Sequence, residues 1–292
     1  MLMEHTCLLD ILEEDNRCYG GVVRLKNGDF GKKITADVTV LASGGVGGLY
    51  KNSTNFKHLT GDALAISLKH DIELKDMTYV QVHPTTLYQE NPKERSFLIS
   101  ESVRGEGALL YDKNMNRFVD ELLPRDVVAQ AILKQMEKDG TDHVWEDLRT
   151  IPKKELEEHF PNILAHCREA GYDPFTECIP VVPAQHYFMG GIKVNHHSKT
   201  TMDALYAVGE TACNGVHGQN RLASNSLLES LVFAKRAAKD LVAHYETVAK
   251  LPESLSELDL EDYQDQESLE EDYKKMVLEK LTEQNQLVSC IV

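Results

Sequence analysis

The sequence lacks several features that would assign it to a specialised class of protein. Its 292 residues contain no apolar run near the roughly 20 residues of a membrane-spanning helix, and the start at Met1 has no secretory signal design. The six cysteines are scattered without a Cys-x-x-Cys pair, so we expect reduced thiols in a cytoplasmic protein. Basic residues are few, 31 against 47 acidic ones, which argues against nucleic-acid binding.

What the sequence does contain is typical of a globular protein with one large domain or two modest ones. Hydrophobic residues make up 42% and charged residues 27%. The net charge of −16 is uneven, because residues 251–292 hold twelve acidic residues and three lysines. Their sparse apolar residues have helical spacing, so we interpret this stretch as a solvated helical extension, with an acidic recruitment arm as the alternative.

The order of strand and helix patterns predicts an α/β fold. Alternating residues over 6–36, with a turn at Asn27-Gly28-Asp29, predict a β-meander. A short buried strand over 37–42 then runs into a glycine-rich loop over 43–48, which permits close approach of a ligand to the backbone. Further strands are expected over 191–194 and 204–209, and helices over 60–70, from 124, over 153–169 and over 226–245.

Two helix starts carry a chemical argument. Ser226 and Glu229 form a capping-box pattern, and a helix N-terminus beside Arg221 favours an anion, although a purely structural helix start is the simpler interpretation. Arg125 is expected in the first turn of its helix, where a cation opposes the helix dipole. It is either a surface residue paired with Asp126 or a residue held there for another reason.

The histidines give no metal signal. His159, His166 and Cys167, and the adjacent His196 and His197, lack the short paired spacing of a zinc site. Taken individually, His83 and His186 are most simply structural histidines.

Seven ordered motifs carry a family resemblance. They are Leu41-Ala42-Ser43-Gly44-Gly45, Gln81-Val82-His83-Pro84-Thr85, Arg104-Gly105-Glu106-Gly107, Pro124-Arg125-Asp126, His186-Tyr187-Phe188-Met189-Gly190-Gly191, Gly209-Glu210, and the series from His217 to Glu229. Over residues 6–245 the chain resembles the flavoprotein family of succinate dehydrogenase, fumarate reductase and L-aspartate oxidase. The strings Val182–Tyr187 and Ala223–Glu229 are most similar to the L-aspartate oxidase branch.

The resemblance implies roles for particular residues. Non-covalent FAD is the implied cofactor, with contacts from Gly44, Gly45, Asp62, Glu210, Asn225, Ser226 and Leu227. The implied substrate is a dicarboxylate bound by His83, Leu98, Ser100, His186 and Arg221, and the implied catalytic residues are Arg125, a proton donor or acceptor, and Arg104. Because an arginine has a reference pKa of about 12.5 or higher, a donor role in fumarate reduction suits Arg125 better than a role as base.

The implied architecture is an incomplete Rossmann-like FAD-binding domain with an inserted α+β capping domain and a helical tail. We expect FAD-binding segments over 1–77 and 188–250, the capping domain over 78–187 and the acidic tail over 251–292. The implied reaction is oxidation of L-aspartate to iminoaspartate with oxygen or fumarate as acceptor, which supplies quinolinate for NAD synthesis and makes quinolinate synthase a pathway partner. The alternatives are a succinate/fumarate oxidoreductase subunit, which would also partner an iron–sulfur subunit, and a non-catalytic flavoprotein-like module.

One departure from the family limits these implications. Its members open with a strand, a Gly-x-Gly-x-x-Gly turn and a helix that hold the FAD pyrophosphate, and this sequence has no such fingerprint. We therefore expect an internal piece of a larger flavoenzyme that begins within the β-meander. We also expect the isolated chain to bind FAD weakly or not at all.

Overall fold

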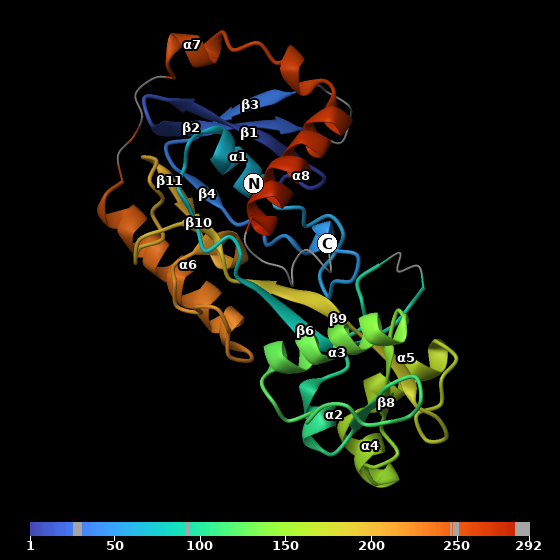
Figure 1. The fold of residues 1–292 in the computed structure, drawn as a ribbon. Coiled ribbons are helices and arrows are strands. Elements are labelled where there is room, and N and C mark those ends of the chain that lie inside the picture. Colours follow the sequence, from blue (N-terminus) through green and yellow to red (C-terminus); the bar gives the residue numbers. More distant parts are fainter. Residues whose placement is uncertain (26–30, 91–93, 246, 248–250, 284–292) are drawn as a thin grey trace. The chain divides into compact units, whose positions relative to one another are not determined.

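A computed structural model describes residues 1–25, 31–90, 94–245, 247 and 251–283 of the chain (Figure 1). The expected turn at Asn27-Gly28-Asp29 lies outside these residues. The chain divides into two compact units, each described by itself below. Unit 1 comprises Met1–Val46, Leu59–Val80 and the described part of Phe188–Asn285, and unit 2 comprises Gly47–His58 and Gln81–Tyr187.

Unit 1 begins with the expected β-meander. Strands β1 (Cys7–Glu14), β2 (Arg17–Arg24) and β3 (Lys32–Thr35) form an antiparallel sheet in sequence order. Gly20 is required where β2 meets β3, because its φ is +126° and a Cβ there would lie 2.0 Å from the carbonyl oxygen of Ile34. One face of this sheet buries Leu9, Leu12 and Val22.

Two small sheets with parallel strand pairs complete the β-structure of unit 1. Strand β4 (Thr39–Leu41) runs parallel to β11 (Leu205–Ala207). Strand β10 (Gly191–Lys193) lies between β12 (Ala212–Cys213), to which it is parallel, and β5 (Leu74–Lys75), to which it is antiparallel. Because β4 and β11 are parallel, the loops that follow both strands leave the sheet at the same edge.

The long helix of unit 1 starts differently from our expectation. Helix α6 (Asn225–Ala243) has Ser224 as its N-cap, with φ +65° and no side-chain capping bond. Ser226 lies inside the first turn, and the side chain of Glu229 accepts a hydrogen bond from Asn214. The capping-box prediction is therefore wrong, because the left-handed turn at Ser224 starts the helix early and Asn214 takes the carboxylate of Glu229. Helix α1 (Asp62–Lys69) matches its prediction.

The acidic tail is helical but not a solvated extension. It forms α7 (Glu253–Ser256), a 3-10 turn η3 (Glu261–Tyr263) and α8 (Gln266–Thr282), and α8 packs against α1. Tyr273, Val277 and Leu281 of α8 are buried, and Leu255 and Tyr263 join the core of the β-meander. The described apolar residues of the tail are few, but none of them is exposed, and Tyr273, Val277 and Leu281 share one face of α8, so most of the described charged residues remain in solvent.

Unit 2 is built on a four-stranded sheet in the order β6 (Val80–Leu87), β9 (Ile179–Phe188), β8 (Val144–Asp147) and β7 (Leu109–Tyr111). Its helices are α2 (Glu101–Gly105), α3 (Arg125–Asp139), α4 (Lys153–His159) and α5 (Pro161–Glu169), with a 3-10 turn η1 (Gly47–Leu49). The single helix expected over 153–169 is wrong: Pro161 cannot continue a helix from α4, and it starts α5 as its first residue.

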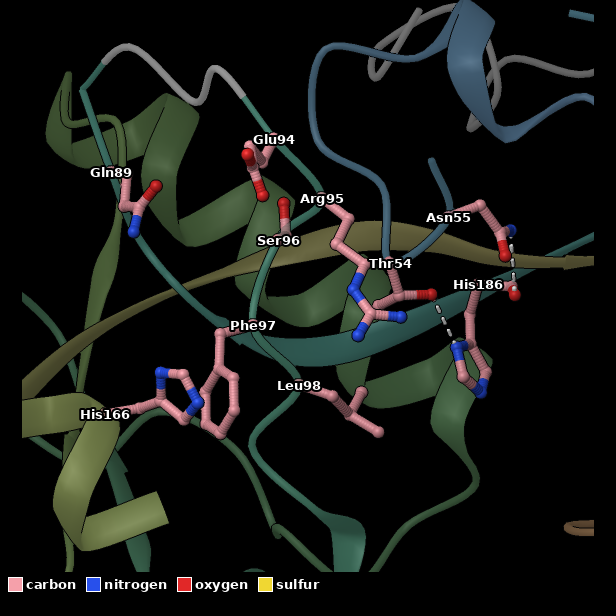
Figure 2. Close-up of a pocket in the computed structure, with 10 residues that line it drawn as sticks. All are labelled: Thr54, Asn55, Gln89, Glu94, Arg95, Ser96, Phe97, Leu98, His166 and His186. Carbon is pink, nitrogen blue, oxygen red and sulfur yellow. Dashed lines mark hydrogen bonds between the residues drawn. The ribbon is translucent and has the colours of Figure 1, made fainter. Parts of the chain in front are cut away.

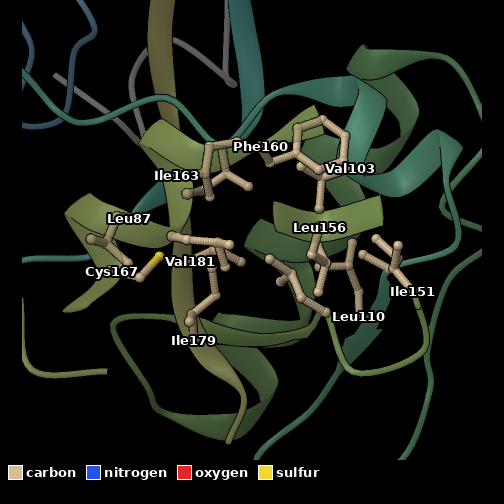
Figure 3. Close-up of a cluster of buried hydrophobic side chains, with 14 of the residues drawn as sticks. Leu87, Val103, Leu110, Ile151, Leu156, Phe160, Ile163, Cys167, Ile179 and Val181 are labelled. Atoms are coloured by element: carbon tan, nitrogen blue, oxygen red, sulfur yellow. The ribbon is translucent and has the colours of Figure 1, made fainter. Parts of the chain in front are cut away.

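The core of unit 2 is aliphatic (Figure 3). Side chains from strands and helices converge there, among them Leu110, Leu156, Ile179 and Val181, all buried. Within the described part of the chain, no helix is long and apolar enough to cross a lipid bilayer. The five described cysteines are free thiols.

Candidate active site

Two histidines from adjacent strands form the centre of the candidate site in unit 2. His83 lies on β6 and His186 on β9, and their rings meet edge to face with centroids 5.5 Å apart. The Oγ1 of Thr54 lies 2.8 Å from Nδ1 of His186, and the amide of Asn55 donates to the carbonyl oxygen of His186 over 3.3 Å (Figure 2). Thr54 therefore orients the ring of His186. The sequence motifs pointed to His186 but not to Thr54.

His83 is uncharged at neutral pH. It is 2% exposed, and its Nδ1 lies 3.0 Å from the carbonyl oxygen of Thr85. Burial lowers the pKa of His83 well below its usual range, and the nearby His186, Arg104 and Arg125 lower it further. When Nδ1 accepts the hydrogen bond from the backbone amide of Thr85 over 3.2 Å, the neutral ring carries its N–H on Nε2 and can offer it to a ligand. The ring offers no positive charge, so the charge must come from the arginines.

Arg125 has a partner that the sequence did not indicate. It is the first residue of α3, and its Nε donates to Oε2 of Glu101 on α2 over 2.7 Å, with a second contact from Nη2. The expected pairing with Asp126 is replaced by this one. Glu101 is 24 residues away in the sequence, and its ion pair with Arg125 lowers its pKa.

Arg104 is a buried cation beside this pair. It lies on α2, is 2% exposed, and donates from Nη1 to the carbonyl oxygen of Glu121 over 2.7 Å. Both arginines act electrostatically on His83. Unit 2 therefore brings together four of its predicted site residues: His83, His186, Arg104 and Arg125.

The other two predicted substrate residues of unit 2 have different surroundings. Leu98 lines a cavity of about 850 Å³ that His186 also lines, together with Thr54, Asn55, Gln89, Glu94, Arg95, Ser96, Phe97 and His166 (Figure 2). Ser100 is the N-cap of α2, where its Oγ accepts from the amide of Ser102 over 3.3 Å. In this structure the hydroxyl of Ser100 therefore caps helix α2.

Unit 1 brings several predicted cofactor residues to one sheet edge. Gly44 and Gly45 follow β4, and Glu210 follows β11 in a 3-10 turn η2 (Gly209–Thr211). A Cβ at Gly45 would lie 2.4 Å from Oε1 of Glu210, an oxygen that accepts from the amide of Phe188 over 2.9 Å. Burial raises the pKa of Glu210 to about 7, against the lowering effects of that hydrogen bond and of Arg221.

Helix α6 packs on η2, the turn that carries Glu210. The backbone amides in the first turn of α6 lack a side-chain cap, and Leu227 is 74% exposed beside Asn225 and Ser226. Arg221 precedes the helix and is buried, with Nη1 donating to the carbonyl oxygen of Leu222 over 3.2 Å. Asp62 starts α1, and its carboxylate accepts from Oγ1 of Thr60 over 2.6 Å.

The described residues contain no group of three or more His, Cys, Asp or Glu side chains that could hold a metal ion. The polar residues of unit 2 suit an anionic organic ligand, since they combine the neutral imidazole of His83 with guanidinium cations.

Comparison with known proteins identifies the class of protein. A family model described as "FAD binding domain" matches residues 1–227, which is more than half of the chain. The chain therefore belongs to this family of FAD-binding domains, and FAD is the cofactor of the family.

The similar proteins narrow the resemblance. The chain is 47% identical over 262 residues to an L-aspartate oxidase of Clostridium perfringens, covering 90% of this chain and 59% of the relative. It is 51% identical over 240 residues to an L-aspartate oxidase of Clostridium acetobutylicum, covering 82% and 55%. A solved E. coli quinol fumarate reductase chain matches with TM-score 0.74 and 33% identity, covering 91% of this chain and 48% of that chain.

These matches confirm the resemblance inferred from the seven motifs and the mixed α/β fold. The chain spans about half of the length of these proteins. Sequence reasoning missed Thr54 and Glu101, for which no local pattern exists, because each acts on a residue far away in the chain.

Proposed function

We propose that this chain forms the dicarboxylate-binding part of an FAD-dependent enzyme that oxidises L-aspartate to iminoaspartate, with oxygen or fumarate as electron acceptor. The observation that carries the proposal is the convergence of His83 and His186 with the field of Arg104 and Arg125 in unit 2. The identity of 47% and 51% to two L-aspartate oxidases supports aspartate as the substrate.

The residues of unit 1 fit FAD at the edge where β4 and β11 end. Gly45 leaves no room for a side chain there, and the uncapped first turn of α6 presents amides and an exposed Leu227. Such a helix terminus favours negative charge, and an exposed leucine suits a flat apolar ring. We assign Gly44, Gly45, Asp62, Glu210, Asn225, Ser226 and Leu227 to cofactor binding, within an incomplete Rossmann-like domain. When bound, FAD would supply the two-electron oxidant.

The residues of unit 2 would bind and orient the substrate. Uncharged His83 would donate a ring N–H group to a carboxylate oxygen, His186 would contribute a second ring nitrogen, and Arg104 and Arg125 would supply the positive charge. From the resemblance we also assign Arg221, Leu98 and Ser100 to substrate binding. We assign unit 2 as a capping domain that excludes water from the reaction.

Arg125 would hold the proton on the guanidinium nitrogen that does not face Glu101. Its pairing with Glu101 uses Nε and Nη2, so Nη1 remains for a ligand. Because arginine keeps its proton at neutral pH, Arg125 serves as proton donor when fumarate is reduced. For aspartate oxidation we assign it to substrate binding and orientation.

A succinate/fumarate oxidoreductase is the second candidate, favoured by the fold match to a fumarate reductase at 33% identity. In either case the product passes to another enzyme; for iminoaspartate we propose quinolinate synthase as the pathway partner. The two candidates differ in substrate, since aspartate carries an amino group that must be deprotonated before oxidation.

The test uses the purified chain with added FAD. A visible flavin spectrum after desalting measures binding, and peroxide formation with L-aspartate, against succinate as the matched substrate, measures activity. Aspartate-dependent peroxide supports the proposal, and succinate oxidation with a dye acceptor but no aspartate activity supports the second candidate. We expect a colourless or weakly coloured protein, because this sequence has no Gly-x-Gly-x-x-Gly turn. A protein that cannot be reconstituted at all removes the idea that this chain alone is an active oxidase, and tight stoichiometric FAD overturns the expectation of weak binding.

A further inference from the structure

A buried carboxyl group in unit 2 has no role in the reaction proposed above. Glu146 lies on β8, is 0% exposed, and faces the interior of the unit. Among the described residues, neither of its two oxygens has a hydrogen-bond partner. Buried polar groups without partners are rare in folded proteins, and each one calls for an explanation.

Arg104, a cation that interacts with Glu146, also has buried polar atoms without hydrogen-bond partners. Arg104 uses Nη1 for the carbonyl oxygen of Glu121, but its buried Nε and Nη2 have no hydrogen-bond partner within the described part of the chain. Two buried donors on Arg104 thus match two buried acceptors on Glu146 in number and charge. The two groups interact electrostatically but make no direct hydrogen bond with one another. Internal water, which makes two to four hydrogen bonds, can satisfy such atoms.

The other acidic residues near Arg104 are already engaged. Glu101 is paired with Arg125, and Glu121 accepts from Arg117 and from the amide of Leu110. Leu110 also pairs with Glu146 across β7 and β8, which places Glu146 and Glu121 on either side of one strand position. By elimination, Glu146 is the acidic group left to balance Arg104, and it has the largest favourable effect on the charge of that guanidinium.

We propose that Glu146 is a positioning residue that acts through Arg104: bridging water joins its carboxyl group to Nε and Nη2, and the ionisation of Glu146 weakens the positive field of the dicarboxylate site. The proposal rests on the proposed function, because Arg104 is assigned there to the substrate site. A residue outside the site thus sets the charge of the site.

The direction of the pH effect follows from the surroundings of Glu146. Burial raises its pKa to about 8, while Arg104 lowers it and Glu121 raises it. Cys167 of α5 also faces it, and burial, with a contribution from Glu146, raises the pKa of that thiol to about 12. The buried side chains of α3 are Val128, Ala129, Ile132 and Gln135, none of which titrates.

Below pH 8, Glu146 is therefore neutral and Arg104 presents a full positive charge to His83 and its neighbours. Above pH 8, the ionised carboxylate neutralises that charge. Dicarboxylate binding should therefore weaken as the pH rises through about 8.

The test is calorimetric binding of succinate to the chain at pH 7 and pH 9, for the native protein and three variants. For the native protein we expect affinity to fall about tenfold, from one unit charge about 10 Å away in a medium of effective dielectric constant about 20. Glu146→Gln keeps the shape and the hydrogen bonds but cannot ionise, so its affinity should change less than about twofold over that range. The leucine of Glu146→Leu cannot form a hydrogen bond with bridging water. The affinity of this variant for succinate should therefore be lower than that of Glu146→Gln at pH 7.

Asp147→Asn is the matched control, because it removes a carboxylate from the adjacent position on β8 that is paired with Arg149. It should keep the native pH dependence. An equal fall in affinity for the native protein and Glu146→Gln would overturn the proposal.

Infrared titration supplies a readout that does not depend on ligand binding. The native protein should show a protonated carboxyl band at pH 7 that is lost near pH 8 and is missing in Glu146→Gln. If Glu146 is already ionised at pH 6, the proposal is wrong, whatever succinate does. If succinate fails to bind at every pH while the band behaves as expected, the dicarboxylate function is refuted and the protonated pair with Arg104 stands.

Discussion

The carboxylate of Asp10 links the acidic tail to the rest of unit 1 through hydrogen bonds. Replacing this carboxylate should lower the free energy of unfolding by a predictable amount. Asp10 is 1% exposed on β1, and it accepts hydrogen bonds from Lys69 over 2.6 Å, from His70 over 2.7 Å and from the hydroxyl of Tyr263 over 2.7 Å. Its Oδ1 also accepts from the amide of Ile11. One carboxylate therefore joins β1, the end of α1 and the tail.

The size of the effect follows from the pKa of Asp10. Burial opposes ionisation, but the hydrogen bonds from His70, Lys69 and Tyr263 outweigh it and lower the pKa to about 2, from 3.8 for an ordinary aspartate. That difference corresponds to about 2 kcal/mol of unfolding free energy. Because the pKa is lowered in the folded state, the contribution is complete above pH 4 or so and disappears as the pH falls through about 2.

Asp10→Asn should therefore lower the free energy of unfolding by at least about 2 kcal/mol at pH 7, with a further contribution from donors left without a charged acceptor. Urea unfolding followed by circular dichroism measures this at pH 7 and again near pH 3, where the difference from the native protein should shrink. Asp71→Asn is the matched control, since Asp71 is exposed and asparagine tolerates its φ of 54°. A loss below about 0.5 kcal/mol, or one that is the same at both pH values, would refute the reasoning.

Three further predictions concern Val277 in the acidic tail, Gly45 at the sheet edge assigned to FAD, and Arg125. Val277→Ala should destabilise unit 1 by about 1–3 kcal/mol in thermal unfolding, because Val277 is fully buried between α8 and α1, whereas exposed Lys275→Ala should not. Gly45→Ala should displace the carboxylate of Glu210 and weaken FAD binding in a flavin fluorescence titration by about tenfold, with Gly105→Ala, at a glycine with free space and no positive φ, as control. Arg125→Lys should lose most fumarate reduction in a dye-oxidation assay, because a lysine cannot contact Glu101 through two nitrogens and still present a third; full activity would remove Arg125 as donor.

The secondary structure was largely predictable from the sequence because its signals are local. The periodicity of α1, the proline before Arg125 and the alternation in β1 and β2 each act within a few residues, and the structure agrees with them. The two errors were local patterns overridden by neighbours. The capping box expected at Ser226 does not form, because Glu229 accepts a hydrogen bond from Asn214 instead. The helix expected over 153–169 is divided at Pro161, which the helical periodicity of the whole segment did not reveal.

The candidate site was only half predictable, for a different reason. The side chains that would touch substrate belong to sequence motifs, so His83, His186, Arg104 and Arg125 could be named from the resemblance. Their partners Thr54 and Glu101 belong to no motif and are recruited from distant segments by the fold. The packing of the tail has the same origin, because Tyr263 reaches Asp10 and Tyr273 reaches the carbonyl oxygen of Leu9 from more than 250 residues away.

Asp10 and Glu146 show how the same physics separates a structural carboxylate from one that can respond to pH. Both are acidic residues within apolar strands, and the sequence does not distinguish them. Asp10 accepts from three side-chain donors and one backbone amide, so its pKa falls to about 2 and its charge is constant at physiological pH. Glu146 has no direct donor among the described residues, so burial raises its pKa to about 8, where a small change in pH alters its charge. Hydrogen-bond satisfaction, rather than burial alone, therefore decides which buried acid holds the fold together and which one can regulate a site.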